Sequence, residues 1–182
     1  AEIFNSDKQM VETLISSVIE KEVKNANTVT CYRKPITGFA EVRNEDFDLI
    51  RKIAGKHHIN PDDLLPGAQS LVAFFLPFSR NVVSANFKNY YIAKEWAVAY
   101  VETNNLIKRI CETVVHTLNE AGIEAAYEEP TCNLDKNNLL SRWSHRSIAK
   151  LTGIGSFGLN RLLITDAGCA GRFGSLVLDS KL

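Results

Sequence analysis

The fold of this 182-residue chain is decided by residues 70–76, which read Ser-Leu-Val-Ala-Phe-Phe-Leu. This apolar run lies between Gly67 and Pro77, has the length of an ordinary strand and is far too short to cross a membrane. A strand that is apolar on both faces has to be covered on both sides. The segment therefore predicts a central strand buried between two layers.

Two long helical patterns flank this strand in the sequence. Residues 10–23 place apolar side chains at steps of three and four, and Ser6 with Gln9 forms a capping-box pattern that predicts the start of the helix at Ser6. Residues 89–121 show a second broad apolar face, and Gly122 supplies the terminator. Both patterns predict amphipathic helices that pack on the sheet.

Shorter elements complete the predicted architecture. They are a helix over residues 45–54 after Asn44, a helical turn at Pro61, a helix over 145–152 capped by Ser144, and strands over 162–165 and 173–178. Strands and helices do not alternate regularly, so we predict an α/β (α+β) sandwich with a mixed, largely antiparallel sheet. We expect a single domain over residues 1–182, with an N-terminal helix in 1–28 and a cofactor and substrate module in 29–182.

Composition limits the classes of function. Lysine plus arginine and aspartate plus glutamate both total 21, and a zero net charge gives no long-range attraction to nucleic acid or to a membrane. The four cysteines, Cys31, Cys111, Cys132 and Cys169, show no metal-ligand spacing, which predicts reduced thiols and no metal site. No signal peptide is visible at the N-terminus. We expect a cytoplasmic protein that acts on a small molecule.

Glycines gather near the carboxyl end, where six of the ten follow residue 152. Residues 153–158 match the G-x-G-x-x-G pattern, but they follow a helix and precede a strand, which is the reverse of a dinucleotide site. The loop can still offer backbone N–H groups to a polar ligand, with side-chain hydrogen bonds from Ser156, Asn160 and Thr165. Alternatively, these glycines only form surface turns.

The second unusual cluster is Trp-Ser-His-Arg at residues 143–146. Ser144 as the cap places His145 and Arg146 in the first helical turn, where a cation opposes the helix dipole. This mismatch indicates an anionic partner, which is either a ligand or a carboxylate of Glu128, Glu129 or Asp135. The alternative is a solvated arginine beside a structural histidine. No sequence motif of a hydrolase or of a phosphate-binding loop is present.

Residues 143–146, the run at 153–160, Leu-Ile-Thr at 163–165 and residues 169–175 together resemble one known group. They are similar to the epoxyqueuosine-reductase-like iron–sulfur proteins, which are distant relatives of the corrinoid reductive dehalogenases. The shared pattern is a helix that ends in Gly-x-Gly, then the Leu-Ile-Thr strand and a Gly-x-x-Gly-Ser strand. The resemblance covers roughly residues 30–180 and is most specific over the last forty.

The resemblance implies a nitroreductase-like module that holds cobalamin against the glycine-rich turns and reduces a substrate there. The residues that it implies as cofactor contacts are Gly153, Gly155, Ser156, Gly158, Asn160, Thr165, Arg146, Gly174 and Ser175. A proton donor is also needed near the reacting centre. Asp135 is the nearest counterpart of the acidic residue of the reductase, and Tyr127 and His145 are its rivals.

The chain departs from this group after the Gly-Ser strand. Relatives continue into a ferredoxin-like module with cysteines spaced for iron–sulfur clusters, and the four cysteines here lack that spacing. We therefore expect electrons from such a segment, absent here, or from an electron-donor protein. The neutral charge argues against a modified tRNA as substrate. Two alternatives remain open: a non-catalytic cofactor-binding or carrier module, and a flavin-dependent nitroreductase-like enzyme.

Overall fold

The computed structural model describes residues 2–87, 90–130, 134–135 and 140–182. Its helices are α1 (Glu2–Lys24), α2 (Asn44–Ala54), α3 (Pro61–Leu64), α4 (Arg80–Phe87), α5 (Lys94–Glu120) and α6 (His145–Leu151). Its strands are β1 (Ile36–Glu41), β2 (Ser70–Pro77), β3 (Ala125–Tyr127), β4 (Leu134–Asp135), β5 (Leu140–Ser141), β6 (Ser156–Phe157), β7 (Leu163–Ile164) and β8 (Gly171–Leu178). The order of elements along the chain mixes helices and strands without a repeating unit.

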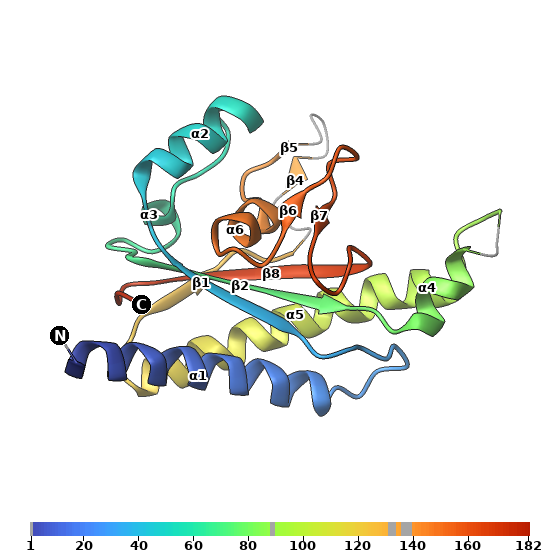
Figure 1. Ribbon diagram of the computed structural model, residues 1–182, viewed down its shortest axis with the longest axis horizontal. Helices are drawn as coiled ribbons and strands as arrows, with labels where there is room; N and C mark the ends of the chain where they lie inside the picture. The colour runs from blue at the N-terminus through green and yellow to red at the C-terminus, as the bar shows by residue number, and fades with distance from the viewer. Residues whose placement is uncertain (1, 88–89, 131–133, 136–139) are drawn as a thin grey trace.

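A four-stranded antiparallel sheet in the order β1-β2-β8-β3 forms the centre of the molecule. The long helices α1 and α5 cover one face, and α2, α3 and α6 lie on the other with the small hairpins β4–β5 and β6–β7 (Figure 1). The predicted α+β sandwich with a largely antiparallel sheet is confirmed.

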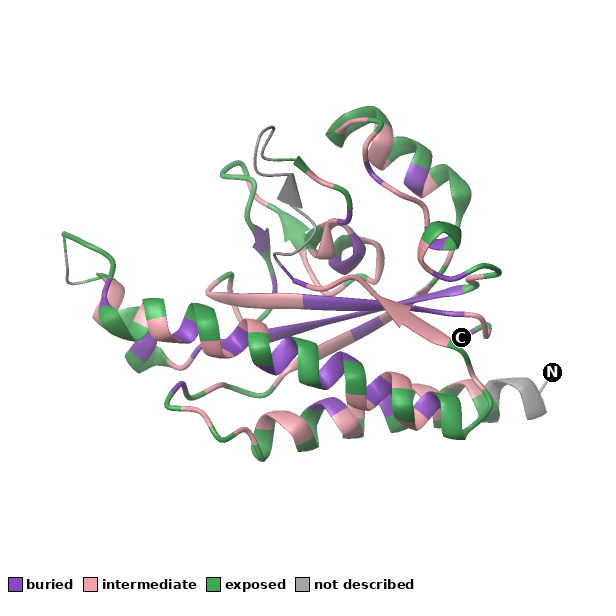
Figure 2. Cartoon of the chain, turned by 180° about the vertical axis from the view of Figure 1, so that it is seen from behind, coloured by how far each residue is buried: buried purple, intermediate pink, exposed green. Residues whose placement is uncertain are grey.

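The central strand β2 is buried over its whole length, as its apolar sequence predicts. Its side chains alternate between two cores, with Val72 and Phe74 facing α1 and α5, and Leu71 and Ala73 facing the α2 and α6 layer. Figure 2 shows this burial as a continuous purple stripe along the middle strands. Coverage of both faces explains why β2 has no polar alternation.

Three sequence predictions need correction. Helix α1 begins at Glu2 instead of Ser6, because residues 2–5 contain neither glycine nor proline and a capping box is only a local preference. Helix α2 begins at Asn44 itself, after Arg43 as its N-cap. The pattern over 89–121 forms α5 only from Lys94.

The separate helix α4 was not predicted. Its sequence, RNVVSANF, is rich in residues of modest helix propensity, so its stability comes from packing. Val82 joins Phe78 and Ala99 in a small buried cluster with Trp96 against it, and this tertiary contact is invisible in the sequence.

The cysteines and helices add two further observations. In the part of the chain that the structure describes, Cys31, Cys111 and Cys169 are unpaired thiols, whereas Cys132 lies outside the described residues. None of the described helices is both long enough and apolar enough to cross a membrane.

Gly174 tests the packing of the sheet. A methyl group added there would clash with the ring of Phe74, which lies directly opposite on β2. We expect Gly174→Ala to lower the free energy of unfolding by about 1–3 kcal/mol through overpacking. Urea denaturation would measure the loss, and the double variant Gly174→Ala with Phe74→Leu should lose less than the sum of the two single variants. Strict additivity would contradict this account.

Candidate functional site

A cavity of about 580 Å³ lies where the start of β8 meets the N-terminal end of α6 and the side of α5. This volume is within the range of small-molecule sites. The residues that line it are Tyr100, Ser141, Trp143, Ser144, His145, Arg146, Leu162, Leu163, Cys169, Gly171, Arg172 and Phe173. The Trp-Ser-His-Arg cluster singled out in the sequence therefore forms one wall of it.

Two interactions fix the start of α6 and with it this wall. The Ser144 hydroxyl accepts a hydrogen bond from the backbone N–H of Ser147 at 3.2 Å, as a helix cap does. The backbone N–H of Ser144 donates to Nε2 of His58 at 3.1 Å. The predicted cap is confirmed, and the cap residue is itself tied to a loop 86 positions away.

His58 acts as a structural histidine. Its ring is buried, stacks on Trp143 with 5.7 Å between ring centroids, and places Nδ1 2.9 Å from the carbonyl of Ile59. Because Nε2 accepts from Ser144, Nδ1 carries the proton and donates to Ile59. Burial lowers the pKa of His58 below its usual value, which keeps the ring neutral.

A chain of side-chain hydrogen bonds runs from Trp143 through Ser175 to His145. Nε1 of Trp143 lies 3.0 Å and Nδ1 of His145 lies 2.8 Å from the Ser175 hydroxyl oxygen. Indole N–H is only a donor, so Ser175 accepts from Trp143 and its own hydrogen is free to point at His145. The hydroxyl oxygen has a second lone pair, so Nδ1 of His145 either accepts from Ser175, with the ring proton on Nε2, or donates to it, with the ring proton on Nδ1.

His145 is neutral and only partly satisfied. Burial, reinforced by the nearby charge of Arg172, lowers its pKa to about 4. Its Nε2 is buried and has no hydrogen-bond partner among the residues that the structure describes. A buried polar nitrogen without a partner costs free energy, and such an atom on a residue that lines a cavity indicates a missing hydrogen-bond partner.

Arg172 adds a positive charge to the same cavity. Its guanidinium carbon lies 4.4 Å from the centre of the Tyr100 ring, a cation–π contact that brings α5 and β8 together. Burial lowers the pKa of Arg172, and Tyr100 partly offsets that effect. Sequence reasoning missed Arg172 and Tyr100, because only the fold brings these two distant positions together.

The carboxylates that were expected to balance the α6 cations have other partners. Glu128 accepts two hydrogen bonds of 3.0 Å from Arg142, and Glu129 lies 2.5 Å from the Lys108 ammonium. Neither of them lines the cavity, so the interpretation that Glu128 or Glu129 compensates Arg146 is wrong. The guanidinium of Arg146 donates instead to the backbone carbonyl of Arg161 at 3.1 Å.

Three of the glycines implied as cofactor contacts are needed for packing within the protein itself. An added Cβ at Gly155 would meet Leu163 and the backbone of Ile164, and one at Gly158 would meet the Ile164 side chain. Gly174 makes room for a ring of the core. Their small size is therefore explained without a ligand, although the β6–β7 turn adjoins the cavity through Leu163.

The remaining expected contacts serve local structure. Gly153 ends α6 with a positive φ of 78°, and Ser156 lies 3.3 Å from the Lys150 ammonium. Asn160 accepts from the backbone of Leu162, and Thr165 donates to the carbonyl of Gly168. None of these four lines the cavity, whereas Arg146 does.

The three candidate proton donors lie in different places. His145 lines the cavity, whereas Tyr127 packs into the core beside α1 and α5, where burial raises its pKa. Asp135 belongs to β4, which pairs with β5 shortly before Trp143, but its side chain lies outside the described residues. Within the described ranges, no three His, Cys, Asp or Glu side chains gather as metal ligands would.

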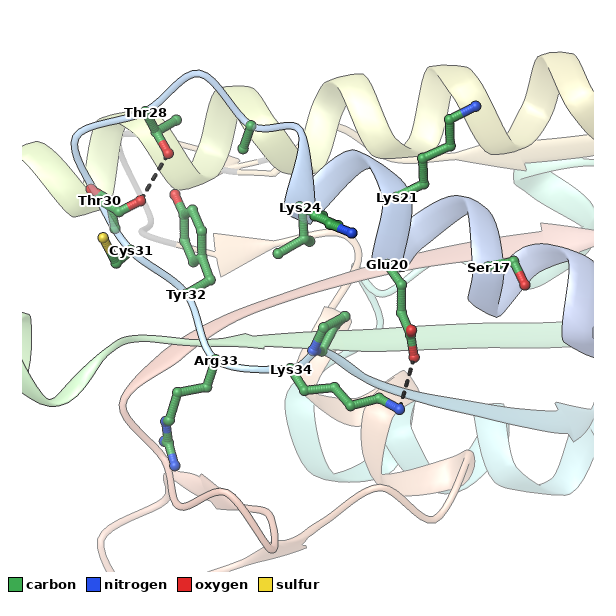
Figure 3. A pocket seen from close by; sticks show the side chains of 13 residues that line it. Ser17, Glu20, Lys21, Lys24, Thr28, Thr30, Cys31, Tyr32, Arg33 and Lys34 are labelled. Atoms are coloured by element: carbon green, nitrogen blue, oxygen red, sulfur yellow. Dashed lines mark hydrogen bonds and ion pairs between the residues drawn. The ribbon is translucent and has the colours of Figure 1, made fainter.

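A second cavity, of about 760 Å³, lies between the end of α1 and residues 28–35 (Figure 3). Its polar groups are largely occupied. Lys34 pairs with Glu20 at 3.1 Å, the Tyr32 hydroxyl lies 2.9 Å from that of Thr103, and Arg33 donates to two backbone carbonyls. Because Glu20, Tyr32, Arg33 and Lys34 already have partners within the protein, this groove is a weaker candidate for a ligand site.

The α+β sandwich has the fold of the epoxyqueuosine reductases. A solved structure of epoxyqueuosine reductase with an epoxyqueuosine-modified tRNA-Tyr stem loop matches 93% of this chain at 16% identity, with a TM-score of 0.55.

Two further epoxyqueuosine reductase structures match in the same way. The enzyme from Streptococcus thermophilus matches over 90% of this chain at 19% identity. That from Bacillus subtilis, solved with its catalytic aspartate loop swung out of the active site, matches over 93% at 16% identity, and both give a TM-score of 0.55.

At this level of identity the comparison shows a shared fold, and the expected relationship to this fold is confirmed. The chain spans slightly less than half the length of the solved chains, 45–46%. No known family matches the sequence, and no curated protein is similar to it in sequence.

Ser175 tests the hydrogen-bond chain. Ser175→Ala leaves the N–H of buried Trp143 without an acceptor, so we expect the free energy of unfolding to fall by about 1–3 kcal/mol. Imidazole nitrogen NMR should also show a shifted signal for Nδ1 of His145, which loses its hydrogen-bond partner. Ser156→Ala removes an exposed hydroxyl and is the matched control, for which little change is expected. Equal stability of the two variants would contradict the chain.

The neutral state of His145 predicts a pH dependence of stability. Between the usual pKa of 6.5 and about 4, the unfolded chain binds a proton that the folded chain does not. The free energy of unfolding should fall as the pH drops through this window, with up to about 1.4 kcal/mol per pH unit from one group. The lowered pKa of His58 should likewise reduce the free energy of unfolding as the pH drops.

Urea denaturation across this pH window measures the slope in the wild type and in His145→Gln, where we expect a shallower slope. His116→Gln replaces an exposed histidine and should keep the wild-type slope. Equal slopes in the His145 and His116 variants would contradict the neutral state of His145 as a cause of the pH dependence.

Proposed function

We propose that this chain is the cofactor and substrate module of an epoxyqueuosine-reductase-like oxidoreductase, which reduces a small-molecule substrate in the α6 cavity. The observation that carries the proposal is this cavity, lined by His145 with its Nε2 unpartnered among the described residues, in a fold shared with epoxyqueuosine reductases. The substrate remains an unidentified compound, and the reaction class is a reduction.

The proposed cofactor is a corrinoid. The cavity supports it because the aromatic side chains of Tyr100 and Phe173 line it and can contact a flat group. When bound, the corrinoid would supply the reducing centre. The glycine turns would support the cavity wall from behind instead of touching the macrocycle, because their space is already filled.

Asp135 is the residue that we propose as proton donor. A general acid has to exchange a proton near the operating pH, which a carboxyl group can do. The Bacillus subtilis structure has an aspartate catalytic loop swung out of its active site, and β5, which pairs with the strand of Asp135, ends at Ser141 in the cavity lining. His145 is kept neutral by burial, so its role is to donate a hydrogen bond and orient the ligand.

Electrons have to come from outside the described module. We propose that an iron–sulfur electron-donor protein or a ferredoxin-like segment supplies them and docks beside the cavity. The exposed side chains of Phe87, Tyr90, Tyr91 and Ile92 form an apolar surface at the α4–α5 connection that suits such docking.

Titration of the purified chain with cobalamin tests the proposal. We expect a saturable change in the visible spectrum that identifies binding, and reduction of the bound cofactor by a low-potential chemical reductant. Binding without turnover of any offered substrate would favour the carrier alternative. A yellow protein that binds flavin and ignores cobalamin would contradict the corrinoid assignment.

The role of Asp135 gives a further prediction. Asp135→Asn removes the acidic proton while keeping the size of the side chain, so we expect substrate reduction to fall by about 10²–10⁴-fold with cobalamin binding unchanged. Asp166→Asn changes an exposed carboxylate in a turn and should leave the rate unchanged. Single-turnover spectra would measure both variants, and an unchanged rate in Asp135→Asn would exclude it as the donor.

A further inference from the structure

The charges around the α6 cavity are all of one sign. Arg146 from α6 and Arg172 from β8 line it, and its described lining residues include no aspartate or glutamate. Clefts lined by one sign of charge concentrate ligands of the opposite sign. The cavity therefore favours an anionic ligand, although the chain as a whole carries no net charge.

Neither arginine has a carboxylate partner within the described part of the chain. Arg172 rests on the Tyr100 ring, and Arg146 uses one N–H for the Arg161 carbonyl. A guanidinium has five N–H donors, so both retain donors for a further acceptor. A partly buried cation without a counter-ion is costly, and an anion from solution would relieve that cost.

His145 supplies a third donor to the same wall. Its Nδ1 is hydrogen-bonded to Ser175, which leaves Nε2 on the opposite edge of the ring without a partner among the described residues. In the tautomer that carries the proton on Nε2, Ser175 donates to Nδ1 while it accepts from Trp143, and the Nε2–H is left for an anion. This N–H and two guanidinium groups in the lining of one cavity make a set of anion donors.

We propose that the α6 cavity binds the phosphate group of a phosphate ester, held by Arg146, Arg172 and the Nε2–H of His145. Phosphate suits this set better than a carboxylate, because its three terminal oxygens can each meet one of the three donor groups. The cavity is larger than phosphate alone, and the rest of its wall is aromatic or apolar, with Tyr100, Phe173 and Leu162. The ligand therefore has a flat or apolar body attached to the phosphate.

This inference rests on the proposed function, because it assigns the phosphate to the cavity in which the reductase would bind its cofactor and substrate. It narrows the class of ligand to compounds that carry a phosphate group. The phosphate belongs either to the substrate of the reductase or to a phosphate-bearing arm of its cofactor. A monoester presents three terminal oxygens to the three groups, and the phosphodiester of a corrinoid arm presents two.

Isothermal titration calorimetry at constant ionic strength tests the phosphate site, with inorganic phosphate, phenyl phosphate and phenol as probes. We expect phenyl phosphate to bind more tightly than inorganic phosphate and phenol not to bind. Either variant Arg172→Gln or Arg146→Gln should weaken phenyl phosphate by about tenfold or more, as expected for loss of a charge-assisted contact. Arg161→Gln removes the same charge from an exposed side chain outside the cavity lining and should bind as the wild type does.

Imidazole nitrogen NMR gives a second readout that does not depend on the arginine variants. The signal of Nε2 of His145 should be that of a protonated nitrogen in the free protein and should shift on addition of phenyl phosphate. Absence of saturable binding, equal weakening by Arg161→Gln, or an unmoved His145 signal would overturn the proposal. Because Arg146 is exposed, its variant keeps the test valid if Arg172→Gln does not fold.

Cobalamin titration separates this inference from the proposed function. If cobalamin binds and phenyl phosphate does not, the phosphate site is wrong and the corrinoid module stands. If phenyl phosphate binds with the expected dependence on Arg146 and cobalamin does not bind, the phosphate site stands and the corrinoid assignment is wrong. Competition between the two ligands would place the phosphate on the cofactor, and simultaneous binding would place it on the substrate.

Discussion

The pairing of β2 with β8 is the interaction on which the rest of the structure depends. The antiparallel register sets Ala73 opposite Ser175 and Phe75 opposite Phe173, so alternate residues of β8 enter the two cores. A slip by one residue would exchange these faces and point Ser175 away from Trp143. The core of the sandwich and the wall of the cavity are therefore fixed by the same register.

The site combines rigid support with unsatisfied donors. His58 ties the cap of α6 to a distant loop, and Trp143 packs between His58 and the hydroxyl of Ser175. Ser175, placed by Trp143, in turn holds the ring of His145 in one orientation through its hydrogen bond to Nδ1. Burial then keeps the ring uncharged, so its contribution is a directed hydrogen bond, whereas Arg172 supplies the charge. This division of roles explains how a neutral protein can present a positive cavity.

The glycines near the carboxyl end serve packing within the protein, whereas their clustering in the sequence suggested contacts with a ligand. Gly155 and Gly158 allow the β6–β7 hairpin to close on Leu163 and Ile164, and Gly174 leaves space for the Phe74 ring. Glycine permits close approach of any neighbouring atoms, and here the neighbours come from the chain itself. The cavity lies beside these turns and is lined by residues of α5, α6 and β8, so Gly155, Gly158 and Gly174 lie outside its lining, whereas Gly171 is part of it.

The sequence by itself determined the buried strand β2, the amphipathic helices α1 and α5, the cap of α6 at Ser144 and the antiparallel character of the sheet, because each follows from local periodicity and propensity. It also singled out His145 and Arg146 through a helix-dipole mismatch. Only the tertiary structure decided that Glu128 pairs elsewhere, that Tyr100 and Arg172 meet, and that Ser175 bridges Trp143 and His145. These contacts join residues 14–72 positions apart, and no local pattern encodes which distant side chains the sheet register brings together.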